Sequence, residues 1–479
     1  MNENRENWSG RIGFVLAAAA SAIGLGNLWR FPYLAAQYGG GTFIVIYLVL
    51  LVTVGFTMMM AEVTIGRATA QSQLTAYNKI KKGWGFVGLI GTIVPFLIIP
   101  YYTVIGGWVL KYFIAFAQMS FGGGELMGAG AAQSSDFFGS FISAPFAPFG
   151  YGVFFLLLCA AVIVMGVRKG IEKSNLVMMP LLFLLTIGIA VYVCTLPGAL
   201  AGIKYYLVPN MDALAGADGT FSVARFGQTL MGAVGQMFFS LSIAMGIMIT
   251  YGSYVPKTAS IEKSVRHIEF FDTLIAFLAG LMIIPMVYVF AVKTGTPVNE
   301  AMKAGPGLMF ITLPKVFASI GPAGNYLGMC FFALVIFAAL TSCISIYEAC
   351  VSAVCDFLKI SRKSSTFFVF FMIAFMSVFP AMGYGAWGDI KVILGMQFLD
   401  LMDFSTSCLL MPINALLTCI LIGWVVGEKY IADEVTHLGE PFKGRKLFAV
   451  MVKYVVPVFL ALLLISETCR NLGLFGWKI

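Results

Sequence analysis

The stretch that decides the fold is "AAAASAIGLGNLWRFP", residues 17–32. Its first half is small and apolar, as expected of a helix that enters a membrane. Its second half holds two glycines, an asparagine, an arginine and a proline within nine residues. Irregular backbone at membrane depth is tolerated only where protein or a water-filled cavity surrounds it. The stretch therefore predicts a helix that breaks inside a protein-lined site, near residues 21–26.

The composition of the chain is that of an integral membrane protein. Of the 479 residues, 60% are apolar and 11% are charged, whereas soluble proteins carry about 25% charged residues. The polar start "MNENRENWSGR" predicts no cleavable signal peptide. The nine cysteines suit neither a disulfide framework nor zinc. His267 and His437 fall in polar connections, and no catalytic set assembles, so we expect no enzyme.

Eleven apolar windows are long enough to cross the hydrocarbon core, which is roughly 30 Å thick. They predict an all-α protein with a single transmembrane domain, residues 1–479. The outer connection at residues 296–322 mixes amphipathic pieces with Gly and Pro and is predicted to be a re-entrant or capping hairpin. The windows lie at about 12–36, 41–66, 87–118, 151–167, 176–196, 226–254, 268–292, 322–355, 366–383, 392–426 and 447–469.

The distribution of basic residues predicts the orientation. Nineteen of the 30 Lys and Arg fall in the connections on the N-terminal side of the membrane, and seven on the other. Cytoplasmic connections carry such an excess, so we expect a cytoplasmic N-terminus and an extracytoplasmic C-terminus. The net charge of +8 follows from this asymmetry. We therefore expect no nucleic-acid partner, and we expect the lipid bilayer to be the surroundings of the chain.

A second break is predicted in "FFSLSIAMGIMITYGSY", residues 238–254, five spans after the first. Secondary carriers built from two inverted repeats place discontinuous helices at such corresponding positions. The repeats would cover about residues 10–198 and 225–427, with an extra helix at about 447–469. The alternative for Gly-x-Gly in a span is a packing seam between helices. Asn27, Arg30 and the second break favour a carrier over this seam and over an ion channel.

The first break would offer a ligand both free backbone N–H groups and free backbone carbonyls. If the second half of the span begins near Leu25, its free N–H groups form a positive pole that suits a carboxylate. The first half would leave free carbonyls around Ala20 to Ile23, which suit a hard cation such as Na⁺. One break could thus hold an anion and a cation together.

Five motifs resemble the neurotransmitter:sodium symporter family: "GRIGFVLAAAASAIGLGNLWRFPYLAAQYGGGTFIVIYL", "AEVTIGR", "GQMFFSLSIAMGIMITYGSY", "AGPGLMFITLP" and "FAALTSCISIYE". The eleven-span count resembles the bacterial branch, with its leucine and hydrophobic amino-acid transporters. The resemblance implies a LeuT-like fold with discontinuous helices 1 and 6. It also implies Na⁺-coupled import of neutral, hydrophobic amino acids by alternating access, in a bacterial-type inner membrane. Alternatives are another small zwitterion or amine, or coupling to H⁺ through Asp272. The oligomeric state stays open.

The resemblance implies two sodium sites. The first would use the Ala22 carbonyl, Asn27, Ser240 and Asp272. The second would use carbonyls and hydroxyls of Ala20, Ile23, Ala338, Thr341 and Ser342. Ala338, Thr341, Ser342 and Ser345 indeed follow the spacing of one helical face. The alternative is that the hydroxyls bond back to their own helix.

Asp272 departs from the many relatives that carry asparagine there and need chloride. A buried aspartate beside sodium would supply a fixed negative charge, so we expect no need for chloride. Tyr47, Gln236 and Ser240 match the chloride-site positions of the family. The alternative is an interfacial aspartate near the cytoplasmic end of its span. Glu62 is a further intramembrane carboxyl, bonded either to frayed backbone of span 1 or 6 or in plain helix packing.

The resemblance also implies gates and a substrate pocket. Arg30 and Asp403 would close the outer path, and Arg5 and Asp356 the inner path, supported by Trp8 and Tyr254; Arg5 could instead be an ordinary positive-inside anchor. Gly24 leaves room for a carboxylate to which Tyr102 could donate, and the wall is apolar, so a neutral side chain is expected. The substrate-binding candidates are Ala22, Gly24, Leu25, Gly26, Ile98, Tyr102, Phe239, Ser242, Met245, Ser342 and Ile346.

Overall fold

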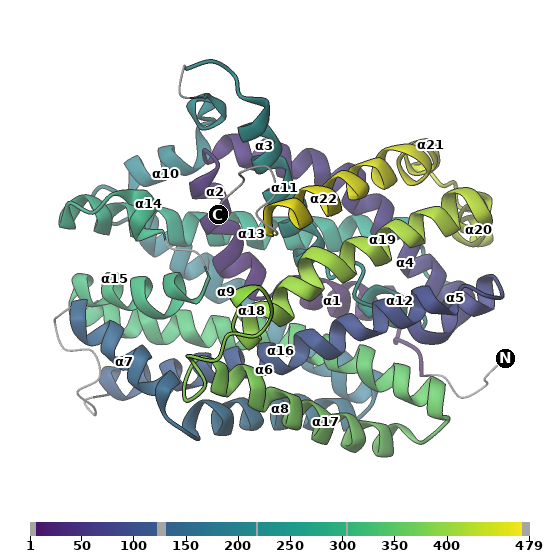
Figure 1. Cartoon of the computed structure of the whole chain (residues 1–479), viewed down its shortest axis with the longest axis horizontal. Coiled ribbons are helices and arrows are strands. Elements are labelled where there is room, and N and C mark those ends of the chain that lie inside the picture. The colour runs from purple at the N-terminus through teal and green to yellow at the C-terminus, as the bar shows by residue number, and fades with distance from the viewer. Residues whose placement is uncertain (1–5, 122–130, 217–218, 303–304, 472–479) are drawn as a thin grey trace.

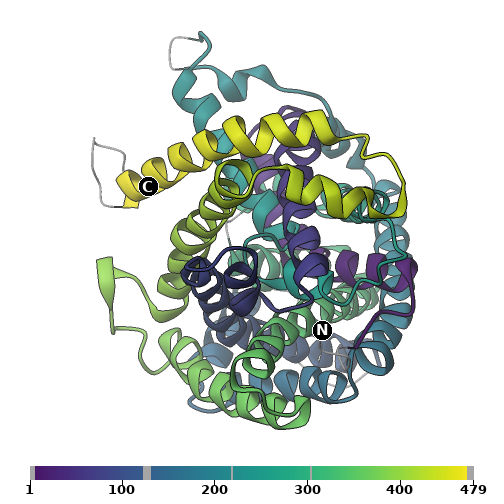
Figure 2. The same cartoon turned by 90° about the vertical axis from the view of Figure 1, so that its right-hand side faces the viewer.

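The computed structural model describes residues 6–121, 131–216, 219–302 and 305–471. Within these ranges the regular elements are helices, joined by two isolated β-bridges, Gly40 with Pro209 and Ala215 with Phe221. The long helices lie side by side along the horizontal of Figure 1 and are seen roughly end on in Figure 2. The all-helical fold class is therefore confirmed.

In the described part of the chain, nine helices are long and apolar enough to cross a membrane. The bent pair Arg11–Ala22 (α1) and Gly26–Gln37 brings the number to ten when its two pieces are counted as one broken span. The nine are Gly41–Thr69 (α3 and α4), Gly85–Ser120 (α6), Ala147–Val164 (α8), Val167–Cys194 (ending in α9), Ile261–Thr294 (α13), Pro322–Leu358 (α16), Arg362–Gly383 (α17), Phe398–Val425 (α18 and α19) and Arg445–Ser466 (α21 and part of α22).

The remaining predicted span, 226–254, is divided into two helices. α11 (Val223–Ser240) and α12 (Ile247–Gly252) are separated by residues 241–246. Neither piece is long enough to count as a span by itself, so the total of eleven stays a prediction. The chain turns here through three residues with positive φ, namely Ser242 (54°), Ala244 (62°) and Gly246 (78°). Only glycine adopts this conformation without strain, so contacts with neighbouring helices must hold the other two.

The first break lies where the sequence predicts it. α1 ends at Ala22, a π-helical turn covers Gly26–Arg30, and α2 (Phe31–Gln37) continues the span at an angle of 51°. α1 is packed against α13 and α16, and its residues Ala17 to Ala20 are fully buried. Small side chains thus let the neighbouring helices approach the broken segment closely.

Two predicted span starts are wrong. The seventh span begins at Ile261 rather than near residue 268, so His267 lies in α13 and not in a polar connection. The fifth span begins at Val167 rather than near residue 176. Gly166, with φ of 92°, makes the turn, and the helix starts directly after it. Arg168, Lys169 and Lys173 therefore lie in the first turns of the helix and not in a connection. An apolar window cannot find this start, because charged residues at a helix end lower the hydropathy without ending the helix.

The connections between spans contain short helices. α5 (Gln73–Ile80) and α20 (Lys429–Val435) lie toward the right-hand end of Figure 1, with the N-terminus. α7 (Ala131–Ser143) and α15 (Leu313–Ile320) lie toward its left-hand end, and α10 (Ala199–Leu207) and α14 (Val298–Ala301) complete the set. The predicted hairpin at 296–322 contains α14 and α15. Its buried Phe310 accepts a hydrogen bond of 2.7 Å from Tyr112 of α6, as a capping hairpin would.

Candidate functional site

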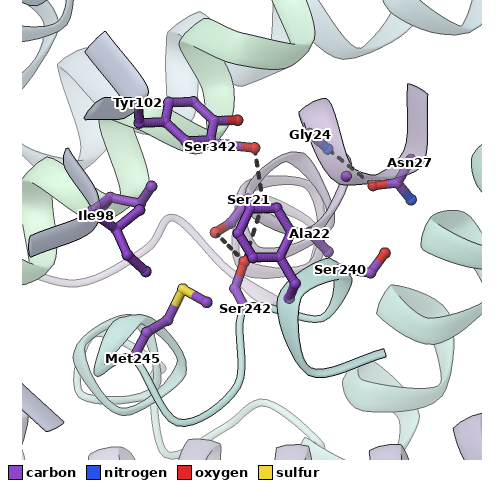
Figure 3. A pocket seen from close by; sticks show the side chains of 13 residues that line it. Ser21, Ala22, Gly24, Asn27, Ile98, Tyr102, Ser240, Ser242, Met245 and Ser342 are labelled. Atoms are coloured by element: carbon purple, nitrogen blue, oxygen red, sulfur yellow. Dashed lines mark hydrogen bonds between the residues drawn. The ribbon is translucent and has the colours of Figure 1, made fainter. Parts of the chain in front are cut away.

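The two helix breaks meet through serine hydroxyls. The Ser242 hydroxyl, in the second break, donates to the Ser21 carbonyl at 3.2 Å, and the hydroxyls of the two serines lie 3.1 Å apart. Ser342, on α16, donates to the same carbonyl at 3.0 Å. Figure 3 shows these contacts around one end of α1. The Ser21 carbonyl, at the end of α1, thus accepts one hydrogen bond from the second break and one from α16.

A cavity of about 20 Å³ lies at this junction, which is room for one or two water molecules. An amino acid therefore requires side chains such as Phe239 and Met245 to move. Every predicted pocket residue except Leu25 lines the cavity, and Leu25 instead donates its N–H to the Tyr102 hydroxyl at 3.4 Å. The lining residues are Ser21, Ala22, Gly24, Gly26, Asn27, Ile98, Tyr102, Phe239, Ser240, Ser242, Met245, Ser342 and Ile346.

Ser21 is the lining residue that sequence reasoning missed. Its hydroxyl bonds to that of Ser242, and its carbonyl accepts hydrogen bonds from Ser242 and Ser342. The signal was present, because Ser21 is the polar residue at the start of the predicted break. What the sequence does not show is that Ser242 and Ser342, more than 200 residues away, converge on it.

The glycines of the first break are required by close packing. A Cβ on Gly24 would lie 2.4 Å from the Ser342 hydroxyl oxygen and 3.1 Å from that of Tyr102. A Cβ on Gly26 would lie 2.7 Å from the ring of Phe239. The Gly24 N–H donates to the Asn27 side-chain oxygen at 3.1 Å. The N–H groups of Gly24 and Leu25 thus face side-chain acceptors that a ligand carboxylate could replace.

Asp272 lies at the centre of a buried polar cluster. Its Oδ1 accepts hydrogen bonds from Asn27 Nδ2 at 2.7 Å and Ser240 Oγ at 2.8 Å, and its Oδ2 accepts one from the Tyr47 hydroxyl at 3.5 Å. All four side chains are at most 1% exposed. The interfacial placement of Asp272 is therefore wrong. Three of the four residues expected at the first sodium site adjoin one another, and the fourth, Ala22, lines the neighbouring cavity.

Two of the three chloride-site positions adjoin the same carboxylate. Tyr47 and Ser240 bond to it directly. Gln236 bonds instead to the Gly26 carbonyl, at 3.1 Å from its Nε2, while its buried Oε1 has no hydrogen-bond partner. The Asp272 carboxylate thus lies against two of the three side chains expected at the chloride site.

The second expected sodium site is brought together only in part. The Ser342 hydroxyl reaches the Ser21 carbonyl at 3.0 Å and the Ile23 carbonyl at 3.5 Å. The Thr341 hydroxyl, however, donates to the Phe337 and Ala338 carbonyls of its own helix, both at 3.0 Å. The back-bonding alternative therefore describes Thr341 here. Ala20, next to Ser21 in the chain, and Ala338, three residues before Thr341, are both fully buried. Carbonyl and hydroxyl oxygens of this kind suit a hard cation.

The outer pair is apart in this structure. Asp403 accepts hydrogen bonds from the hydroxyls of Tyr101, at 3.2 Å, and Ser407, at 3.0 Å. Arg30 lies over the ring of Phe239, 5.7 Å from its centroid, and no ion pair joins it to Asp403 among the residues that the structure describes. Both charged residues are partly exposed, and each contacts partners other than the opposite charge.

The inner side is closed by Trp8. Its backbone N–H donates to the Tyr254 carbonyl and its indole N–H to the Tyr251 carbonyl, both at 3.0 Å. Its ring also packs edge-on against both tyrosine rings, at 5.1 and 5.9 Å. Asp356 accepts a hydrogen bond of 2.6 Å from the Ser72 N–H. The predicted partner of Asp356, Arg5, lies outside the described residues.

Glu62 bonds to the second break. Its Oε1 accepts a hydrogen bond from the Ala244 N–H at 2.7 Å, and Asn414 donates to the Ala244 carbonyl at 3.2 Å. These two contacts hold Ala244 in its left-handed conformation. Of the predicted alternatives, bonding to frayed backbone of span 6 is therefore the one the structure has.

The comparison with known proteins agrees with this geometry. The chain matches the Sodium:neurotransmitter symporter family over residues 5–122 and 152–473. The chain belongs to this family. The symporter is accordingly a sodium-dependent, multi-pass membrane transporter and not an enzyme.

Relatives and a solved structure cover almost the whole symporter. It is 33% identical to the sodium-dependent transporter YhdH of Bacillus subtilis over 96% of this chain and 97% of that one. It is 27% identical to the human sodium- and chloride-dependent GABA transporter 2, over 91% of this chain and 75% of that one. The crystal structure of MhsT in complex with L-phenylalanine matches with a TM-score of 0.84 and 32% identity, over 97% of this chain and 100% of that one.

Proposed function

We propose that this symporter imports neutral, hydrophobic amino acids together with Na⁺, by alternating access and without chloride. The observation that carries the proposal is the position of Asp272, which is buried against Asn27 and Ser240 beside the cavity between the two breaks. A buried carboxylate is stabilised by a bound cation. The first sodium ion would be held here, with the Ala22 carbonyl and the substrate carboxylate.

The cavity lining supports an amino acid with a neutral side chain. Among the described residues, its lining contains no Asp, Glu, Lys or Arg, so a charged side chain would find no partner. The N–H groups of Gly24 and Leu25 and the Tyr102 hydroxyl would bind the carboxylate, and Ile98, Met245 and Ile346 would contact the side chain. The phenylalanine in the MhsT structure is consistent with this substrate class.

The coupling ions follow from the same residues. A second sodium ion would use carbonyls of Ala20, Ile23 and Ala338 with the hydroxyls of Thr341 and Ser342, once Thr341 turns from its own helix. Chloride would not be needed, because Asp272 supplies the negative charge itself. Eleven spans in two inverted repeats, a cytoplasmic N-terminus and a bacterial-type inner membrane complete the proposal.

Binding of labelled leucine or tyrosine to the purified protein tests the proposal. Replacing Na⁺ with K⁺ or choline should abolish binding, and replacing chloride with gluconate should leave it unchanged. Competition by the twenty amino acids then identifies the preferred side chain. Binding that persists without Na⁺ and varies with pH would instead favour H⁺ coupling through Asp272. Competition by an amine that lacks a carboxylate would overturn the amino-acid assignment.

A further inference from the structure

A second cavity lies between α3 and α13, away from the substrate site. Its volume is about 240 Å³, far larger than the cavity at the helix breaks. Residues of span 2 line one side and residues of span 7 the other, with Phe31 of α2 between them. The lining residues are Phe31, Ile44, Tyr47, Leu48, Phe270, Thr273, Leu274 and Phe277. We call this space the α3–α13 crevice.

The α3–α13 crevice offers almost no polar atoms to an occupant. Its two hydroxyl-bearing residues use their hydroxyls elsewhere: Thr273 donates to the Glu269 carbonyl at 2.7 Å, and Tyr47 to Asp272 at 3.5 Å. A buried water needs about two to four polar partners, whereas a dry cavity of about 150 Å³ lined by Leu, Ile and Phe binds benzene. The crevice therefore suits a hydrocarbon better than water.

The crevice is continuous with the surface that the bilayer covers. Leu48 is 39% exposed and Phe270 is 61% exposed at its two edges. On the same helix as Leu48, the side chains of Val45, Val49 and Val52 are 55 to 57% exposed. These apolar side chains belong to a membrane span, so lipid hydrocarbon is what lies against them. We propose that the α3–α13 crevice binds one acyl chain of a membrane phospholipid.

The back wall of the crevice connects the acyl chain to Asp272. The rings of Phe31 and Tyr47 pack edge-on at 5.1 Å, and the Tyr47 hydroxyl continues to the Asp272 carboxylate. An acyl chain against the Tyr47 ring restricts its movement and keeps its hydroxyl at Asp272. Acyl-chain binding thus favours sodium binding, a consequence that rests on the proposed sodium role of Asp272.

Photo-crosslinking tests the site without relying on transport. The full chain is reconstituted in vesicles that contain a phosphatidylcholine with a diazirine in one acyl chain, and the labelled peptides are identified by mass spectrometry. Labelling should concentrate in residues 44–48 and 270–277, above exposed lipid-facing positions such as Leu184 on α9. Leu48→Trp, which places an indole in the crevice and narrows it, should reduce the excess labelling, whereas Val52→Trp should not. Uniform labelling of all lipid-facing helices would overturn the proposal.

A sodium titration tests the connection to Asp272. Delipidation in detergent should raise the sodium concentration for half-maximal leucine binding about fivefold, a typical size for coupling between sites. Leu48→Trp should resist this shift, because its indole stays in the crevice, while Val52→Trp should behave as the unaltered protein does. Equal shifts in both variants would disprove the coupling. A loss of all sodium dependence would contradict the proposed function instead, and the crosslinking result would still stand.

Discussion

Gly24 is the glycine of the proposed substrate site at which an added Cβ would lie closest to a neighbouring atom. Gly24→Ala would place a methyl group 2.4 Å from the Ser342 hydroxyl oxygen. Overpacking of this kind costs about 1–3 kcal/mol, so we expect substrate affinity to fall by roughly tenfold or more. The measurement is Na⁺-dependent leucine binding to the purified variant.

The matched control for Gly24 is Gly188→Ala, on α9. A Cβ there meets nothing within 4 Å, and alanine is the better helix former. This variant should bind leucine as the unaltered protein does and unfold at an equal or slightly higher temperature. If both alanine variants bind equally well, the close contact at Gly24 does not limit the site.

In the proposed function, Asp272 supplies the negative charge that makes chloride unnecessary. Asp272→Asn removes the fixed charge while Asn27, Ser240 and Tyr47 remain beside it. Removing one member of a buried charge pair costs about 2–5 kcal/mol, so sodium affinity in gluconate should fall at least roughly tenfold. Chloride should partly restore it in this variant. Glu62→Gln, which replaces a different buried carboxyl, should not create a chloride effect; a chloride effect in both variants would argue against a specific role for Asp272.

The sequence predicts residues whose role follows from their immediate neighbours in the chain. It does not predict residues whose role arises because distant helices bring their side chains together. Gly24, Asn27 and Arg30 occur in one short stretch that breaks a helix, so their importance is visible in the sequence. Gln73 shows no such signal. It lies on α5, yet its side chain contacts the positions of Gly91 and Gly246 in other spans, and its amide atoms are buried without partners. Only the packed structure places it beneath the second break.

At the scale of elements, the two breaks are held in different ways. The first relies on glycines and on serines that satisfy the end of α1. The second contains Ser242 and Ala244 in left-handed backbone, at about 1–2 kcal/mol per residue, and relies on side chains from α4 and α19. Hydropathy predicts where such spans lie. It cannot predict which distant side chain supports each break, nor that the fifth span begins at Val167.

Glu62 should act on the second break as a hydrogen-bond acceptor. Glu62→Gln retains an oxygen for the Ala244 N–H and should preserve binding, whereas Glu62→Leu leaves that N–H without a partner. An unsatisfied buried donor costs about 1–3 kcal/mol, so the leucine variant should lower both thermal stability and substrate affinity. Thermal unfolding and leucine binding measure the two effects. Equal loss in both variants would show that the negative charge, and not the hydrogen bond, matters.

At the scale of the whole molecule, the two ends of the transport path differ. The inner end is joined by the contacts of Trp8 with Tyr251 and Tyr254, while Arg30 and Asp403 at the outer end have separate partners. A carrier that alternates between two states keeps one end closed at a time. In this structure the inner end is joined by Trp8, and the proposed outer pair, Arg30 and Asp403, is apart.

Trp8→Ala should shift this balance toward the inward-facing state. The substitution removes the indole hydrogen bond to Tyr251 and the two aromatic contacts that join Trp8 to the inner end. A loss of about 1.4 kcal/mol changes the ratio of two states tenfold, so hydrogen exchange in α12 should accelerate by about that factor. Na⁺ should slow it again if sodium favours the outward state. Trp84→Ala is the control, because Trp84 packs against Phe86 at the start of α6; faster exchange of α12 in that variant would mean that lost stability, and not the inner closure, is being measured.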